Sequence, residues 1–200
     1  PYLDHGGRFW WNNGANNWTG VCAGSVGQSL LIREPDPQRQ AQGLAMGDSL
    51  VEDSAIETAK ELLALGGKKL HLPVDVVLAD KFDAEAAWKE APVGNVPEGW
   101  RILDIGPRSV AAFAKALKGA GTVVWNGPMG VFEFPKFAEG SYGVAKAVAE
   151  SGAISVIGGG ESVEAVKKSG VADKITHIST GGGASLELLE GLVLPGLAAL

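Results

Sequence analysis

Two short apolar runs in this sequence lead into three consecutive glycines, and a helical pattern follows each glycine run. Ile154–Ile157 leads directly into Gly158–Gly160. Ile175–Ser179 leads, after one residue, into Gly181–Gly183. A strand that turns at once into a helix is typical of βαβ units, in which the helix returns the chain so that the next strand runs parallel. The two turns therefore favour a parallel sheet.

The chain after residue 40 continues this alternation of short apolar runs and amphipathic segments. The remaining predicted strands are 70–72, 74–78 and 122–125. The predicted helices are 55–65, 110–117, 142–150, 162–168 and 184–189, and residues 81–100 are predicted to be irregular. Continuous apolar strands are typical of sheets that are buried on both faces. We therefore predict an α/β fold, with a three-layer, open, doubly wound, Rossmann-like parallel sheet that carries helices on both faces.

Residues 1–40 differ from the rest of the chain. Three of the six tryptophans fall in this segment, at Trp10, Trp11 and Trp18, and only Ser29–Ile32 resembles a strand. An ordered loop region is the main interpretation. The alternatives are a stacking platform for sugars or bases, a fusion scar, or a corrupted reading frame. We therefore divide the chain into an atypical segment, 1–40, and a regular domain, 41–200.

The composition excludes several classes of protein. The chain has 200 residues, of which 46% are apolar and 20% are charged, which is typical of a globular domain. Its net charge of −6 disfavours binding to nucleic acid or to an anionic membrane. The one cysteine, Cys22, cannot form an intramolecular disulfide, and no apolar run is long enough to span a bilayer. Because no secretory pattern is seen at its start, we expect a cytoplasmic protein.

The two glycine turns are candidates for a phosphate site. Open parallel sheets bind ligands outside the carboxyl ends of their strands, where a glycine turn and a helix N-terminus present backbone N–H groups to an anion. A glycine turn is often only a tight connection, and neither turn matches a P-loop or the dinucleotide fingerprint. Because two similar turns occur in one sheet, we predict that 158–160 and 181–183 bind phosphate groups.

Three polar residues near the glycine-rich turns have both a structural and a functional interpretation. Glu161 and Ser162 begin the helix after the first turn. An acidic residue there commonly stabilises the helix N-terminus, but beside a phosphate it also holds Mg²⁺. Glu133 is either a solvated surface charge or an acceptor for ribose hydroxyls. The sequence shows no nucleophile paired with a base.

Several longer runs resemble one enzyme family, the phosphoglycerate kinases. The most specific are VVWNGPMGVFE (123–133), VIGGGESVEAV (156–166) and HISTGGGASLELLEG (177–191). Three upstream runs are similar to the same family and occur in its order: AQGLAMGDSL (41–50), LPVDVVLADKF (72–82) and PEGWRILDIGP (97–107). The resemblance covers residues 41–200 and corresponds to most of the C-terminal, nucleotide-binding lobe of a two-lobed kinase. It implies a nucleotide-binding domain over 41–200 whose sheet is incomplete at its N-terminal side.

The resemblance implies Mg²⁺-dependent phosphoryl transfer from 1,3-bisphosphoglycerate to ADP, giving 3-phosphoglycerate and ATP. The residues it assigns to the walls of the adenine pocket are Phe82, Leu103, Pro128 and Val131. Those it assigns to the ribose and phosphates are Glu133, Asn126, Gly158, Gly159, Gly160, Glu161 and Ser162, with Glu161 also the metal ligand. Those it places against the transferred phosphoryl group, as the catalytic residues, are Gly181, Gly182 and Gly183.

The sequence departs from the family pattern at three positions and in one region. Glu161 stands where Asp is usual, Leu192 where Lys is usual, and Ile102 where a Gly beside the adenine pocket is usual, so that Ile102 is expected to crowd the base. Residues 1–40 match neither a phosphate-contacting Lys at a strand exit nor a second glycine-rich turn, both expected there. We expect a monomeric ADP/ATP half-site with little turnover of its own. A non-catalytic nucleotide-binding module and a non-functional truncated piece are the alternatives.

Overall fold

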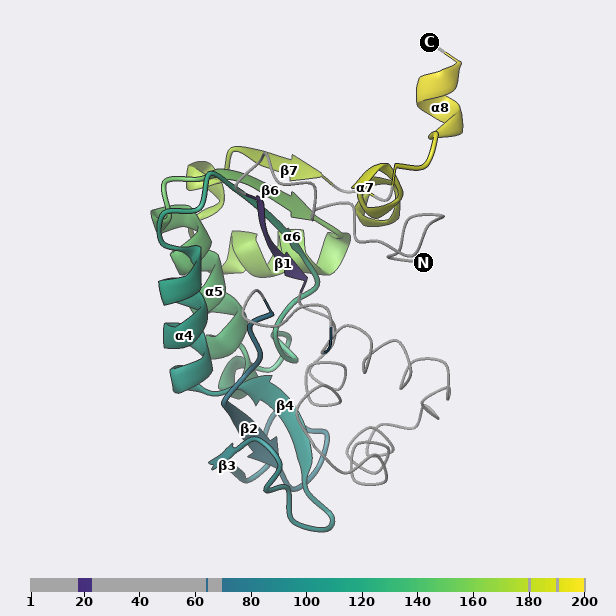
Figure 1. Cartoon of the computed structure of the whole chain (residues 1–200). Helices are drawn as coiled ribbons and strands as arrows, with labels where there is room; N and C mark the ends of the chain where they lie inside the picture. The colour runs from purple at the N-terminus through teal and green to yellow at the C-terminus, as the bar shows by residue number, and fades with distance from the viewer. Residues whose placement is uncertain (1–17, 23–63, 65–69, 180, 190, 200) are drawn as a thin grey trace.

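A parallel sheet forms the upper part of the protein in the computed structural model (Figure 1), which describes residues 18–22, 64, 70–179, 181–189 and 191–199. Its four strands are β1 (Trp18–Cys22), β5 (Thr122–Asn126), β6 (Ile154–Gly158) and β7 (His177–Ser179), in the order β1-β5-β6-β7. Every neighbouring pair in this sheet is parallel. Since parallel strands present their carboxyl ends at one edge, the exits of β5, β6 and β7 lie together.

A second, smaller sheet is antiparallel and lies below the first in Figure 1. Its strands are β2 (Asp75–Ala79), β3 (Trp88–Pro92) and β4 (Arg101–Ile105), in the order β3-β2-β4. Alternate residues of β2 face opposite sides, as a strand requires. Val77 and Ala79 pack with Leu103, whereas Val76 and Leu78 pack with Ala91.

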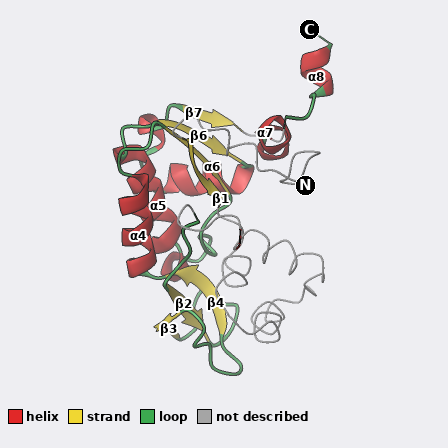
Figure 2. Cartoon of the chain, viewed as in Figure 1, coloured by secondary structure: helices red, strands yellow, loops and turns green. Residues whose placement is uncertain are grey.

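The longer helices form one layer beside the sheets (Figure 2). They are α4 (Pro107–Leu117), α5 (Glu139–Glu150) and α6 (Gly160–Lys168), and α5 contacts both of the others. Since α4 also contacts β2, and α5 contacts β4, this layer joins the two sheets. The remaining helices are η3 (Pro135–Phe137), η4 (Ala172–Lys174), α7 (Gly182–Leu189) and α8 (Pro195–Ala198).

The main core lies between the parallel sheet and the helical layer. Trp125 of β5 is fully buried there and belongs to one cluster with Val144 of α5 and Val166 of α6. Burying such side chains contributes about 1.5–3 kcal/mol each. Among the described residues, the side chains on the other face of the parallel sheet are less buried. Ile154 of β6, for example, is 58% exposed.

Two buried aspartates of the antiparallel sheet cap helices that lack a cap of their own. The N-cap residues of α4 and α5 are Gly106 and Ala138, and neither makes a side-chain capping hydrogen bond. Asp75 of β2 instead accepts hydrogen bonds from the backbone N–H of Arg108 (3.0 Å) and of Ser109 (2.7 Å), at the start of α4. Asp104 of β4 accepts one from Gly140 N–H at the start of α5 (2.7 Å). Carboxylates at helix N-termini are favourable because they satisfy free N–H groups and oppose the helix dipole.

The predicted α/β class and the open parallel sheet are confirmed. The strands predicted at 74–78, 122–125, 154–157 and 175–179 and the helices at 110–117, 142–150, 162–168 and 184–189 correspond to β2, β5, β6, β7, α4, α5, α6 and α7. The predicted strand at 29–32 and the predicted helix at 55–65, apart from residue 64, lie outside the described residues.

Two predictions of secondary structure are wrong. Residues 70–72 join neither sheet, because the run ends at Pro73 and β2 begins only at Asp75. The span 81–100 is not wholly irregular, since it contains β3. The strands β1 and β4 were not predicted. No helix in the described part of the chain is long and apolar enough to cross a membrane.

Candidate functional site

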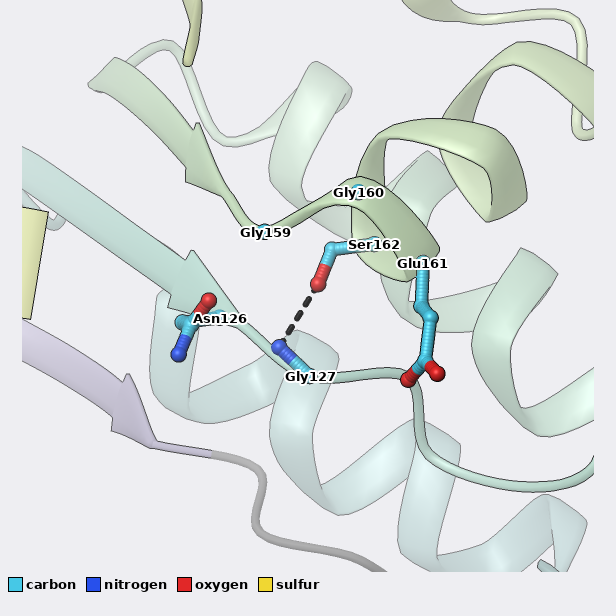
Figure 3. Close-up of a pocket in the computed structure, with 6 residues that line it drawn as sticks. All are labelled: Asn126, Gly127, Gly159, Gly160, Glu161 and Ser162. Atoms are coloured by element: carbon cyan, nitrogen blue, oxygen red, sulfur yellow. Dashed lines mark hydrogen bonds between the residues drawn. The ribbon is translucent and has the colours of Figure 1, made fainter. Parts of the chain in front are cut away.

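A pocket of about 390 Å³ opens where β5 and β6 end. It is lined by Asn126, Gly127, Gly159, Gly160, Glu161 and Ser162 (Figure 3). Asn126 is the last residue of β5, and Gly127 follows it. Gly159 joins β6 to α6, and the other three residues form the first turn of α6. The pocket therefore lies at the carboxyl edge of the parallel sheet, where the sequence predicted an anion site.

The exit of β5 is held rigidly by hydrogen bonds from its own backbone. Gly127 N–H donates to the Ser162 hydroxyl oxygen (2.6 Å), and Met129 N–H donates to that of Ser141 (2.9 Å). Val131 N–H donates to the Leu103 carbonyl oxygen (2.8 Å). These N–H groups are consequently not free for a ligand. What this exit offers the pocket is the side chain of Asn126.

The exit of β6 offers backbone donors instead. Gly159, which caps α6, has a φ of +90°, a conformation that L side chains rarely adopt. The first hydrogen bond of α6 runs from Val163 N–H to the Gly159 carbonyl oxygen. The N–H groups of residues 160–162 come before it and have no partner within the helix. They carry the partial positive charge of the helix N-terminus, which suits a phosphate group.

The turn after β7 packs directly against the turn after β6. A Cβ built on Gly182 would lie 2.7 Å from Gly159 Cα and 3.1 Å from the side-chain oxygen of Asn126. A Cβ on Gly159 would lie 2.6 Å from that same oxygen. The structure therefore brings Asn126 and the two glycine turns to one place. Gly181 and Gly183, at the start of α7, are exposed beside it.

Glu161 is the one carboxylate that lines the pocket. Figure 3 shows its side chain extending from the first turn of α6. No hydrogen bond or ion pair within the described residues engages it, and no group of three potential metal-ligating residues occurs among them. One free carboxylate fits Mg²⁺ that arrives with phosphate oxygens and water, since Mg²⁺ is usually held by one or two carboxylates plus substrate phosphates.

The residues predicted to contact the base lie away from these turns, around the antiparallel sheet. Leu103 is buried, and Val131 packs against the same cluster. Phe82 is 57% exposed and packs against Phe134 in a tilted arrangement, with 5.1 Å between the ring centroids. Pro128 is half-buried in the loop between the pocket and this cluster. Phe82, Pro128 and Val131 are thus at least partly exposed, whereas Leu103 is buried in the core cluster.

Ile102 does not crowd these residues, contrary to the expectation from the family pattern. Its side chain packs with Val76 and Leu78, on the face of the antiparallel sheet opposite to Leu103. Successive residues of a strand point to opposite faces, which explains the difference.

Glu133 is exposed, as both of its interpretations require. Its charge acts on Lys168: a hydrogen bond to Glu164 raises the pKa of Lys168, and the charge of Glu133 adds to that rise. Glu133 thus stands near a lysine, and its role toward a ribose stays a prediction.

Sequence reasoning missed two residues that shape the site. Ser141 holds the loop after β5, and Asp104 holds the start of α5. Ser162, which was predicted, lines the pocket and also joins the exits of β5 and β6. The signal for Asp104 was a charged residue inside the apolar run that became β4.

Comparison with known proteins gives a consistent assignment. Residues 38–192 match the family model of phosphoglycerate kinase. A phosphoglycerate kinase from Roseiflexus castenholzii is 58% identical over 163 residues, and a chloroplastic one from Volvox carteri is 59% identical over 167. These alignments cover 80% of this chain but only 41% and 36% of the relatives, so the chain spans about two fifths of their length.

Solved structures agree with this assignment. Phosphoglycerate kinase from Coxiella burnetii has a TM-score of 0.74 at 36% identity, over 90% of this chain and 46% of that one. The enzyme from Pyrococcus horikoshii has a TM-score of 0.69 at 31% identity, over 96% of this chain and 53% of that one. The sequence motifs, the glycine turns at the sheet edge and these relatives lead to one conclusion: the chain belongs to the phosphoglycerate kinase family.

Proposed function

We propose that this chain forms the ADP/ATP half-site of a phosphoglycerate kinase. The observation that carries the proposal is the meeting of Asn126 with the turns at Gly159 and Gly182, at the start of two helices. Two helix N-termini that point at one place can bind the phosphate chain of a nucleotide through backbone N–H groups. This mode of binding needs no basic side chains, in keeping with a net charge of −6.

The proposed reaction transfers a phosphoryl group from 1,3-bisphosphoglycerate to ADP and gives 3-phosphoglycerate and ATP. Such transfer depends on positioning and on stabilising charge rather than on a protein nucleophile. The N–H groups of residues 160–162 would hold the nucleotide phosphates, and the glycines Gly181, Gly182 and Gly183 would face the group in transit. Mg²⁺, when bound, neutralises charge on the phosphate oxygens. Glu161 would hold it from the protein side.

The base and the ribose complete the proposed nucleotide site. Phe82, Leu103, Pro128 and Val131 would contact the adenine, and Glu133 would accept from the ribose hydroxyls. The loop 127–131 joins the pocket to the apolar cluster, and its ends are at most about 14 Å apart because they are four residues apart in sequence. One nucleotide can therefore reach both regions.

The chain spans about two fifths of the length of these relatives. We propose that the phosphoglycerate half of the reaction belongs to the part of those proteins that this chain does not match. We expect little or no turnover from the chain alone. We further propose a monomer in the cytoplasm with no nucleic-acid or membrane partner, although the Volvox relative is named as chloroplastic.

Isothermal calorimetry of the chain with Mg·ADP tests the proposal, with Mg·GDP as the control ligand. We expect saturable binding that weakens when a chelator removes Mg²⁺, and weaker binding of Mg·GDP. A cooperatively folded chain that binds neither nucleotide would contradict the proposal.

A further inference from the structure

Asp104 is a buried carboxylate that the proposed chemistry does not use. It is 1% exposed and is the fourth of the five residues of β4. Its Oδ2 accepts from Gly140 N–H (2.7 Å) and its Oδ1 from Ile105 N–H (2.9 Å). No cation pairs with it among the described residues, and the negative charge of Glu139 nearby disfavours a negative charge on Asp104. Burying a carboxylate in this way is costly, so its retention calls for a reason.

The surroundings of Asp104 are shaped to admit its carboxylate. A Cβ added to Gly130, in the loop after β5, would collide with this group. A Cβ added to Gly140, in the first turn of α5, would collide with it as well. Asp104 thus fills a space between the loop and the helix that only glycines leave open.

The same loop joins the pocket to the apolar cluster. It begins at Gly127, which lines the pocket, and ends at Val131, whose N–H donates to the carbonyl oxygen of Leu103 (2.8 Å). Leu103 directly precedes Asp104 in β4. The position of the Asp104 carboxylate therefore affects both β4, which carries Leu103, and the loop 127–131, which carries Val131. Both residues are proposed to contact the base.

We propose that Asp104 is a positioning residue for the nucleotide. It fixes the loop 127–131 and Leu103 against the first turn of α5, and so sets the distance between the base-contacting surface and the phosphate-binding turns. It does not touch the nucleotide itself. This inference rests on the proposed nucleotide half-site.

Asp75 supplies a matched control. It too is a buried aspartate of the antiparallel sheet, 3% exposed, that caps a helix through backbone N–H groups. The hydrogen-bond partners of its side chain are Arg108 and Ser109, at the start of α4, and neither belongs to the loop 127–131. Asp75→Asn should therefore affect stability without altering the spacing of the nucleotide contacts.

The experiment compares the affinities of the parent chain, Asp104→Asn and Asp75→Asn for Mg·ADP and Mg·pyrophosphate by calorimetry. The N–H groups of Gly140 and Ile105 each donate to a different oxygen of Asp104. An asparagine has only one side-chain oxygen, so one of these N–H groups loses its acceptor. We expect Asp104→Asn to weaken the binding of Mg·ADP about fivefold, which is the effect of losing one hydrogen bond. Its affinity for Mg·pyrophosphate should stay nearly unchanged. We expect Asp75→Asn to change neither. Equal losses for both ligands, or no loss, would overturn the inference.

A second variant tests the same point from the loop side. Gly130→Ala leaves the carboxylate in place but pushes the loop away from it, so the same selective loss of Mg·ADP binding is expected. If neither variant folds, Asp104 is required for the fold itself and the inference is also overturned. Failure of the parent chain to bind Mg·ADP would instead contradict the proposed function, which separates the two results.

Discussion

Gly182 lies against Gly159 with no room for a side chain between them: a Cβ on Gly182 would stand 2.7 Å from Gly159 Cα and 2.8 Å from its nitrogen. The two residues begin helices that follow different strands, so this contact sets the spacing of two phosphate-binding turns. Because both partners are backbone atoms, neither can rotate away from an added methyl group.

We predict that Gly182→Ala separates the two turns. The variant should lose about 1–3 kcal/mol of unfolding free energy, the usual effect of overpacking. It should also bind Mg·pyrophosphate roughly tenfold more weakly, because the donors no longer converge. Urea unfolding and calorimetry measure the two effects.

The control for this prediction is Gly183→Ala, at the next position of the same turn. A Cβ there meets nothing within 4 Å, so its unfolding free energy should stay close to that of the parent chain. Equal stability of the two variants would show that the contact between the turns does not matter.

We predict that Glu161→Gln removes most of the Mg²⁺ dependence of nucleotide binding. The amide keeps the shape of the side chain but not its charge, and a neutral ligand holds Mg²⁺ less well. In this variant, the affinity for ADP measured in the presence of Mg²⁺ should fall toward the affinity measured in its absence. Glu164→Gln, one turn along α6, is the control, since its exposed ion pair with Lys168 contributes little. An unchanged Mg²⁺ effect in Glu161→Gln would exclude the metal role.

We predict that Asp75→Ala destabilises the chain by about 1–2 kcal/mol, the usual effect of removing a helix cap. The substitution leaves the N–H groups of Arg108 and Ser109 without their acceptor at the start of α4. Urea unfolding measures the change, and Asp173→Ala on exposed η4 is the control. A loss no larger than that of the control would mean that the cap is unimportant.

We predict that Asp104 makes the stability of the chain fall as the pH rises. Burial raises the pKa of Asp104 from 3.8 to about 7, and Glu139 adds to the rise although hydrogen bonds from Gly140 and Ile105 oppose it. A raised pKa in the folded state favours the protonated form. The contribution of this group is therefore fully present below about pH 4 and is lost as the pH passes 7.

The measurement is urea unfolding of the parent chain and Asp104→Asn between pH 4.5 and 8.5. The parent should lose stability relative to the variant by at most about 1.4 kcal/mol per pH unit, the slope for one proton, and the difference should level off above pH 8. Curves that stay parallel throughout this range would show that Asp104 does not titrate there.

The sequence predicted the strands and helices that are marked by a pattern of neighbouring residues. The apolar runs of β5 and β6 and the glycines that follow them allowed the sheet edge and the pocket to be placed correctly. The edge strand β3 was missed because four of its five residues are exposed, so it carries no apolar run. The run at 70–72 has strand-like residues but no partner strand, and pairing is not a local property.

The contacts that organise the site are long-range, which is why they could not be predicted. Asp104 meets Gly140 across 36 residues, and Gly127 meets Ser162 across 35. Nothing in the spacing of these residues indicates that they meet. The glycine turns were visible because a single turn and the helix after it already constitute an anion site.

Reliance on the main chain for anion recognition also affects which changes this surface tolerates. Donors that belong to the peptide backbone cannot be deleted by exchanging a side chain. Substitutions that alter surface charge around the turns, other than at Glu161, should therefore have little effect on phosphate affinity, whereas a single added methyl group at Gly182 should weaken it. Sequence drift at such a site is limited by volume and backbone conformation rather than by charge.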